Sequence, residues 1–141
     1  MIEIIYESRG SFPFGPDDLH AMLAQARQRN EASGVTGVIL YDRGVFLQVL
    51  EGDAAAVEAT FARICRDPRH RNLFVLRRAP IAQHSFADWR MGFLSVSASP
   101  KALAGFSDFL HAGVLGLDLD AGSVARIVHA VRDRGFRAAI R

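Results

Sequence analysis

The chain has 141 residues, of which 50% are hydrophobic and 23% charged, so it is expected to fold as one soluble globular domain. Its single cysteine, Cys65, excludes an internal disulfide and a cysteine-rich metal site, and no apolar run reaches the roughly 18 residues of a membrane span. No secretory leader is expected at the start of the sequence, and a cytoplasmic location is the expectation.

The net charge of +2 conceals an imbalance between the two basic residue types. Sixteen arginines stand against one lysine, Lys101, and six of these arginines lie within residues 63–78. This stretch is the main basic patch of the sequence, but no aromatic or glycine-rich RNA motif is interleaved with it. A solvated surface is therefore expected there, and nucleic-acid binding is not.

Hydrophobic periodicity predicts the element order β-α-β-β-α-β-β. Helices are expected to open at Pro16 and after Asp53 and to stop at Gly34 and Pro68, and residues 8–15 are expected to form a loop. Strands are expected over residues 2–7, 35–42, 45–50, 73–81 and 89–96, the second and third joined as a hairpin. This order predicts an α+β fold, a ferredoxin-like mixed five-stranded sheet in which the first and third strands lie side by side.

The strand that contains Gln48 is apolar on both faces, with Gln48 the single exception. Such a strand is covered on both sides of its sheet. The two crossover helices can cover only one side, so two C-terminal amphipathic helices, over about 101–111 and 123–134, are expected to cap the other. The sequence thus predicts a sheet domain over residues 1–96 and a helical cap over 97–141.

Three polar side chains occupy positions where the pattern calls for core hydrophobes. Tyr6 lies on the first strand, Asn30 ends the apolar stripe of the first helix, and Gln48 is central in the third strand. An unpaired buried amide costs on the order of 1–3 kcal/mol, so Asn30 and Gln48 require partners, and a ligand is one such partner. The alternative is structural: Tyr6 as a half-buried strand aromatic, Asn30 as a helix C-cap, and Gln48 bonded to neighbouring backbone.

Four strings occur in order along the chain: IIYES, RNEASGVTGVILYDRGVFLQVLEG, RDPRHRN and FADWRMGF. Together they closely resemble the BLUF family of flavin-binding blue-light photoreceptors, in its short single-domain type. The resemblance covers about residues 1–96, and its GVFLQVLEG and WRM strands stand at the family's distances from the opening tyrosine. The family implies the same order of strands and helices.

The resemblance implies non-covalent binding of FAD, with FMN as a substitute in some preparations. It makes Tyr6 the photochemical donor of an electron and a proton, Gln48 the amide that changes its hydrogen bonding, and Asn30 the anchor of the flavin. A flavin edge offers a carbonyl acceptor beside an N–H donor, and a carboxamide offers both complements. Arg29 stands where many relatives carry Asn or His, so a charged contact with the flavin is expected there.

The resemblance also implies that Arg63 and Asp67 lie near the flavin, and their spacing of four predicts one helix face. A surface ion pair is the alternative for these two residues. Trp89 and Met91 share one face of the last predicted strand and are the candidates for signal transmission, with the choice of the inner residue left open. The scattered histidines predict no metal site.

The leading hypothesis is a non-enzymatic photoreceptor that signals to a separate partner protein and forms a homo-oligomer, without membrane contact. One alternative is a small acylphosphatase-like hydrolase, in which residues 8–11 would hold a phosphate and Asn30 a water molecule, although the glycine-rich signature loop of that class is missing. A second alternative is a non-catalytic interaction module that uses the arginines of residues 63–78. The colour of the purified protein separates the three.

Overall fold

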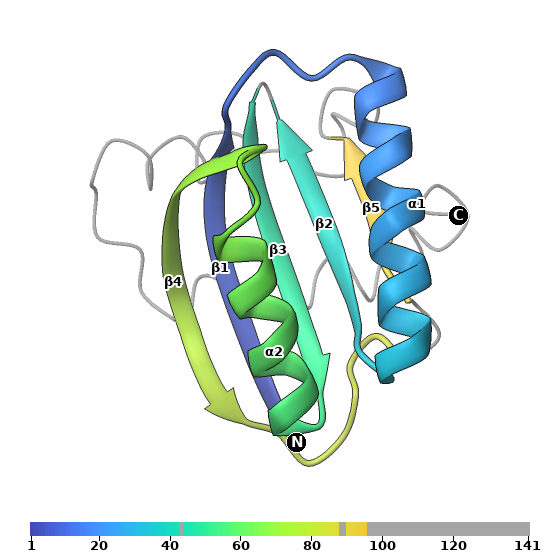
Figure 1. Cartoon of the computed structure of the whole chain (residues 1–141). Coiled ribbons are helices and arrows are strands. Elements are labelled where there is room, and N and C mark those ends of the chain that lie inside the picture. The colour runs from blue at the N-terminus through green and yellow to red at the C-terminus, as the bar shows by residue number, and fades with distance from the viewer. Residues whose placement is uncertain (43, 88–89, 96–141) are drawn as a thin grey trace.

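The computed structural model describes residues 1–42, 44–87 and 90–95, which form an α+β fold with one sheet and two helices (Figure 1). The elements in chain order are β1 (Ile2–Gly10), α1 (Pro16–Ser33), β2 (Thr36–Asp42), β3 (Val45–Gly52), α2 (Ala54–Cys65), β4 (His70–Pro80) and β5 (Gly92–Ser95). The predicted α+β architecture is confirmed for the first four strands and both helices. The predicted C-terminal helices, and with them the cap over residues 97–141, lie outside the described residues.

The strands form a sheet in the order β4-β1-β3-β2-β5. The three pairs β4–β1, β1–β3 and β3–β2 are antiparallel, whereas β5 pairs with β2 in parallel. The predicted pairing of the first and third strands is confirmed, and its register places Tyr6 directly opposite Gln48. Because residues opposite each other in a sheet project from the same face, this register brings the two side chains together.

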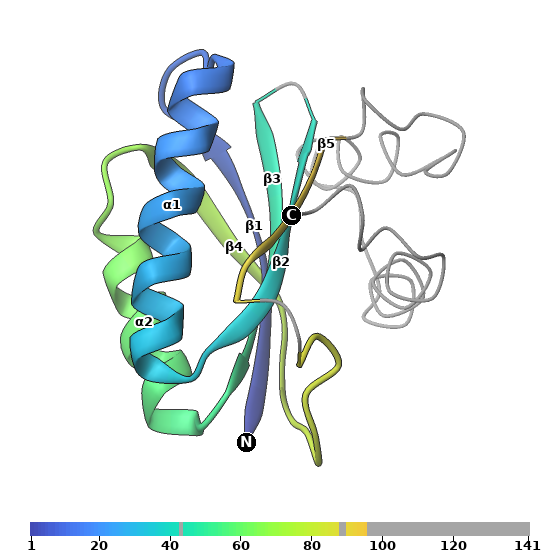
Figure 2. The same cartoon turned by 90° about the vertical axis from the view of Figure 1, so that its right-hand side faces the viewer.

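Both helices pack on one face of the sheet, which Figure 2 shows in side view. The main core lies between the helices and this face, and it contains Ile4, Tyr6, Met22, Leu23, Val35, Ile39, Phe46, Leu50, Val57 and Met91. Along β3 the helix-facing positions alternate, so Gln48 projects between Phe46 and Leu50. Every residue of β3 is buried, which confirms that this strand is covered on both faces.

Helix α1 has clear start and stop signals in the sequence. Pro16 occupies its first turn, and the carboxylate of Asp18 accepts a hydrogen bond from the backbone N–H of Gly15 at 2.9 Å. The helix ends where Gly34 adopts φ 75°, and the N–H of Gly34 donates to the carbonyl of Asn30 at 2.8 Å. Asn30 therefore closes the helix with its backbone and keeps its side chain for another contact.

Several predicted boundaries are wrong. The last strand begins at Gly92 and not at residue 89, so Met91 precedes it, and β3 continues to Gly52. Strand β1 continues to Gly10 instead of ending in a loop at Ser8, because pairing with both β3 and β4 outweighs the weak strand preference of Ser and Gly. Helix α2 stops at Cys65, before Pro68, and a tight turn follows in which the N–H of Asp67 donates to the carbonyl of Ile64 at 3.0 Å. Strand β4 consequently starts at His70, earlier than predicted.

No helix in the described part of the chain is long and apolar enough to cross a membrane.

Candidate functional site

A cavity lies on the helix side of the sheet, between α1 and α2 and above the middle of β3. Its empty volume, which includes space open to solvent, is about 470 Å³. Residues from every part of the domain except β1 and β5 line it: Met22, Gln25, Ala26, Arg29, Asn30, Ile39, Gln48, Thr60, Arg63, Ile64, Asp67, Arg69 and His70. Five of the residues predicted for the site, Arg29, Asn30, Gln48, Arg63 and Asp67, are thus brought together.

Tyr6 lies beside this cavity, with its side chain fully buried. Its phenol donates a hydrogen bond to Oε1 of Gln48, the residue opposite it on β3. Its ring packs against that of Phe61 from α2, with 5.2 Å between centroids. Burial raises the pKa of Tyr6 well above its usual range, with smaller contributions from Cys65 and Asp67. The phenol is therefore protonated at neutral pH.

The other end of the Gln48 amide points toward the chain that leads into β5. Nε2 of Gln48 lies 3.6 Å from Sδ of Met91, and both side chains are buried. Met91 thus contacts Gln48 on the helix side of the sheet. Trp89, the other residue predicted for signal transmission, lies outside the described residues.

Two residues of α1 hold the chain around Met91 in place. Nδ2 of Asn30 donates to the carbonyl of Arg90 at 2.5 Å, and Nε of Arg27 donates to the carbonyl of Met91 at 2.9 Å. Asn30 is buried and also lines the cavity, so its side chain contributes both to the cavity wall and to the anchor of the chain before β5. This double position explains why a polar residue ends the inward stripe of α1.

The turn between α2 and β4 brings a charged pair to the cavity. Asp67 forms an ion pair with Arg69, with 2.6 Å between Oδ2 and Nη2, and its Oδ1 also accepts the backbone N–H of Arg69 at 3.0 Å. Hydrogen bonding by Arg69 lowers the pKa of Asp67. Two expectations for Asp67 are therefore wrong: it lies beyond the helix and not on a shared helix face, and its ion-pair partner is Arg69, not Arg63.

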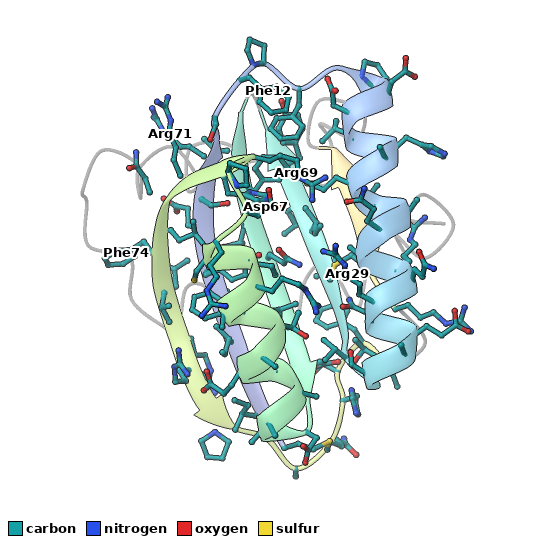
Figure 3. The ribbon with its side chains drawn as sticks, in the orientation of Figure 1. Phe12, Arg29, Asp67, Arg69, Arg71 and Phe74 are labelled. Carbon is teal, nitrogen blue, oxygen red and sulfur yellow. The ribbon has the colours of Figure 1, made fainter. Side chains whose placement is uncertain are left out.

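Figure 3 shows Arg29 extending from α1 and the Asp67–Arg69 pair beyond the end of α2. His70, the first residue of β4, also lines the cavity, and its Nδ1 lies 3.3 Å from Oγ of Ser8. Burial lowers the pKa of His70, so its imidazole is neutral at pH 7.

Sequence reasoning missed Arg69 and His70, although both belong to the RDPRHRN string, and it missed Thr60. Thr60 is buried on α2 three residues after Val57, which is a polar residue on an inward helix face. That pattern could have identified it, as it identified Asn30 on α1. Across residues 1–42, 44–87 and 90–95, no group of three metal-ligating side chains could hold a metal ion.

The proposed phosphate loop of the hydrolase alternative does not exist. Ser8 and Arg9 lie in β1 and pair with β3. The N–H groups that a phosphate would require are occupied, because Gly10 donates to the carbonyl of Gly44 and Ser11 to that of Arg69, each at 2.9 Å. The chain around residues 8–11 therefore offers no row of free amides.

The fold and the site together define an α+β domain with a cavity beside a buried, hydrogen-bonded Tyr–Gln pair. Residues 1–92 match the BLUF family, described as sensors of blue light using FAD. The chain belongs to this family, and the predicted resemblance is confirmed. FAD is accordingly the cofactor with which its family senses light.

The chain is also similar to individual relatives. Photoactivated adenylate cyclase subunit beta from Euglena longa is 34% identical over 104 residues, which cover 73% of this chain and 12% of that protein. Photoactivated adenylate cyclase subunit alpha from Euglena gracilis is 35% identical over 86 residues, 61% of this chain and 8% of that protein. The chain thus spans only a small part of the length of these relatives.

Solved structures show the same similarity. The dark-state structure of BlrB, a BLUF protein, has a TM-score of 0.81 and 28% identity, with 94% of this chain and 96% of that chain covered. BlsA in its photo-activated state has a TM-score of 0.79 and 26% identity, with 93% and 94% covered. Klebsiella pneumoniae BlrP1 with FMN and cyclic diGMP has a TM-score of 0.66 and 29% identity, with 96% of this chain and 35% of that chain covered.

Proposed function

We propose that this protein is a blue-light receptor that holds FAD non-covalently between α1 and α2 and converts light absorption into a change in the hydrogen bonds of Gln48. One observation carries the proposal. The buried phenol of Tyr6 donates to Oε1 of Gln48, and Nε2 of the same amide reaches Met91, at the wall of the cavity between α1 and α2. A change on the cavity side of Gln48 is thereby coupled to the start of β5.

The chemistry of the cavity lining suits FAD. The carboxamides of Asn30 and Gln48 offer donors and acceptors that complement a flavin edge. The lining carries three guanidinium groups, from Arg29, Arg63 and Arg69, and one carboxylate, that of Asp67. This excess of positive charge suits the diphosphate of FAD. The apolar part of the lining suits the ring system of the flavin. Cys65 does not line the cavity, so a covalent link between this cysteine and the flavin is not expected.

Bound FAD would supply the absorption of blue light and the capacity to accept an electron. Tyr6 would give up an electron from its phenol ring and then its hydroxyl proton, which Oε1 of Gln48 is placed to receive. Because burial favours the protonated phenol, Tyr6 holds this proton firmly until its ring is oxidised. Charge separation then starts from one defined protonation state.

The amide of Gln48 has two chemically different ends, and this difference makes it a switch. In the observed arrangement, Oε1 accepts from Tyr6 and Nε2 donates toward Sδ of Met91, which is an acceptor. Rotation of the amide, or its conversion to the tautomer, would change whether a donor or an acceptor faces each of the two neighbours. Rotation would set an oxygen against the sulfur and remove the hydrogen bond from Gln48 to the side chain of Met91. Met91 is therefore the proposed exit of the signal.

The output would go to a separate partner protein, from a receptor that has no catalytic activity of its own, is homo-oligomeric and is cytoplasmic. The similar proteins named photoactivated adenylate cyclases are much longer than this chain, and their cyclase activity is not part of this proposal. Through Met91, and through Trp89 if it exchanges with Met91, light would change the packing of residues 97–141 and with it partner or self-association. Hydrogen exchange in the dark and under light should differ more in these residues than in the loops of residues 1–95.

An absorption spectrum tests the proposal directly. Protein purified in the dark should be yellow, and heat or acid should release all of its flavin into the supernatant, where chromatography separates FAD from FMN. Blue light should move the flavin bands to longer wavelength, and the shift should reverse in the dark. A colourless protein that does not take up added FAD would contradict the receptor, as would a flavin spectrum that light leaves unchanged.

A further inference from the structure

Glu51, near the end of β3, is a completely buried carboxylate that takes no part in lining the cavity. It lies three positions after Gln48 on the same strand, so the two side chains project from opposite faces of the sheet. A buried carboxylate is costly unless hydrogen bonds satisfy it. The hydrogen-bond partners of Glu51 therefore show which segments its carboxylate holds together.

Its partners come from β2 and from the segment between β4 and β5. Oε1 accepts the N–H of Phe86 at 2.5 Å and the hydroxyl of Thr36 at 3.0 Å, and Oε2 accepts the N–H of Ser85 at 2.9 Å. Two successive backbone amides thus converge on one carboxylate. Each charge-assisted bond of this kind is stronger than a bond between neutral groups.

A histidine extends the arrangement. Nδ1 of His84 lies 2.6 Å from the hydroxyl oxygen of Thr36. That hydroxyl has one proton, which it gives to Glu51, so Nδ1 of His84 must carry a proton and donate to Thr36. Three successive residues, from His84 to Phe86, are therefore held directly or through Thr36 by Glu51, and Phe86 is itself buried.

The segment that Glu51 holds leads within a few residues to Met91. Its far end is also fixed, because Asn30 binds the carbonyl of Arg90 and Arg27 binds that of Met91. The same strand, β3, thus carries both the anchor of this segment and the amide that its methionine contacts. A fixed distance along β3 separates the two points.

We propose that Glu51 is a positioning residue for the light response: by clamping Ser85 and Phe86 it fixes the segment that places Met91 against Gln48. This inference rests on the proposed photoreceptor function. When Gln48 rearranges, the segment can follow only by moving against this anchor. Weakening the anchor lowers the barrier to that movement, so the return from the lit to the dark arrangement becomes faster.

The test uses Glu51→Gln in the full-length holoprotein. The variant keeps the size of the side chain but replaces one acceptor oxygen with an NH₂ group, which cannot accept a backbone N–H. Glu58→Gln is the matched control, because Glu58 is half-exposed on α2 and pairs only with Arg78 among the contacts described. Both variants are also made in the Met91→Ala background, which completes a double-mutant cycle.

Glu51→Gln should retain the flavin and the light-induced shift, and its dark recovery should be about threefold faster or more, which is the size of coupling expected between groups in one network. Glu58→Gln should recover at the wild-type rate. In the Met91→Ala background, Glu51→Gln should add no further acceleration, an outcome that general loosening of the fold would not produce. An equal acceleration in both backgrounds, or none in either, would overturn the proposal.

A second measurement separates this inference from the receptor itself. In the dark, amide exchange at Ser85 and Phe86 should be about tenfold faster in Glu51→Gln than in Glu58→Gln. If wild-type protein shows no light response, the receptor has failed, and this exchange still decides whether the anchor exists; equal exchange in the two variants would refute it. Should Glu51→Gln not fold, Thr36→Val, which removes one of the three donors, must accelerate recovery by a smaller factor, and an unchanged rate would again overturn the proposal.

Discussion

The hydroxyl of Tyr6 donates its hydrogen bond to the carboxamide oxygen of Gln48, its direct cross-strand neighbour in the centre of the sheet. A strand pair is a rigid support, so the two groups stay in register without help from a loop. The same amide contacts Met91 through its nitrogen. The centre of the sheet thus joins a proton donor, a two-ended amide and a candidate output residue in one line.

Removal of the Tyr6 hydroxyl should abolish the light response without removing the flavin. In Tyr6→Phe the ring keeps its packing against Phe61, but the proton that Gln48 accepts is lost. The flavin content should equal that of the wild type, and the reversible shift to longer wavelength should disappear. Gln48→Leu should lose the shift as well. Tyr41→Phe, which changes the one other tyrosine of the sequence, is the control and should keep it. A normal photocycle in Tyr6→Phe would exclude the assigned role.

Asn30→Ala should weaken both flavin binding and folding. The side chain lines the cavity and also donates to the carbonyl of Arg90, so the substitution removes one partly buried hydrogen bond and leaves that carbonyl without its donor. We expect a loss of about 1–3 kcal/mol in the free energy of unfolding and an increase of about tenfold or more in the dissociation constant of FAD. Urea unfolding of the apoprotein and titration with FAD measure the two effects. Unchanged affinity would show that Asn30 is only an anchor of β5.

The stability of the protein should fall as the pH is lowered below about 6.5, partly through His70. Burial lowers the pKa of His70 in the folded protein, so below the ordinary histidine value of about 6.5 the unfolded chain binds more protons than the folded one. His70 therefore contributes a slope of up to about 1.4 kcal/mol per pH unit, from about pH 6.5 down to its folded pKa. His70→Gln should flatten the pH dependence, whereas His20→Gln, at an exposed position of α1, should not. Identical slopes in wild type and His70→Gln would contradict this account.

Gly37→Ala should destabilise the fold with no change at the cavity lining. A Cβ at Gly37 would collide with the backbone carbonyl of Val49 on β3, and backbone cannot move aside as a flexible side chain can. We expect a loss of about 3 kcal/mol in the free energy of unfolding, as for an overpacked core. Gly15→Ala, where the nearest atom is a side-chain oxygen of Asp18 at 3.5 Å, should cost much less in the same urea titration. Equal losses would mean that the strands separate more easily than the structure indicates.

The sequence by itself determined the order of the elements and the identity of the central residues. Periodicity separated strands from helices, and Tyr6, Asn30 and Gln48 were conspicuous because polar groups on an apolar face require partners. The end of β1 was not readable, since the local residue preference at Ser8 competes with pairing to β3, which is distant in sequence. The end of α2 was missed for a different reason, because a local turn at Asp67 stops the helix before Pro68.

The tertiary structure decided which buried polar groups form hydrogen bonds with one another. The hydrogen bond from Tyr6 to Gln48 depends on strand register, and the contact of Gln48 with Met91 depends on how the chain enters β5 beside α1. The role of Glu51 is the clearest case, because its partners at Ser85 and Phe86 lie more than thirty residues away in sequence. Periodicity reports only that a position is buried; the direction of a hydrogen bond is set when separate segments meet and each buried donor must find an acceptor.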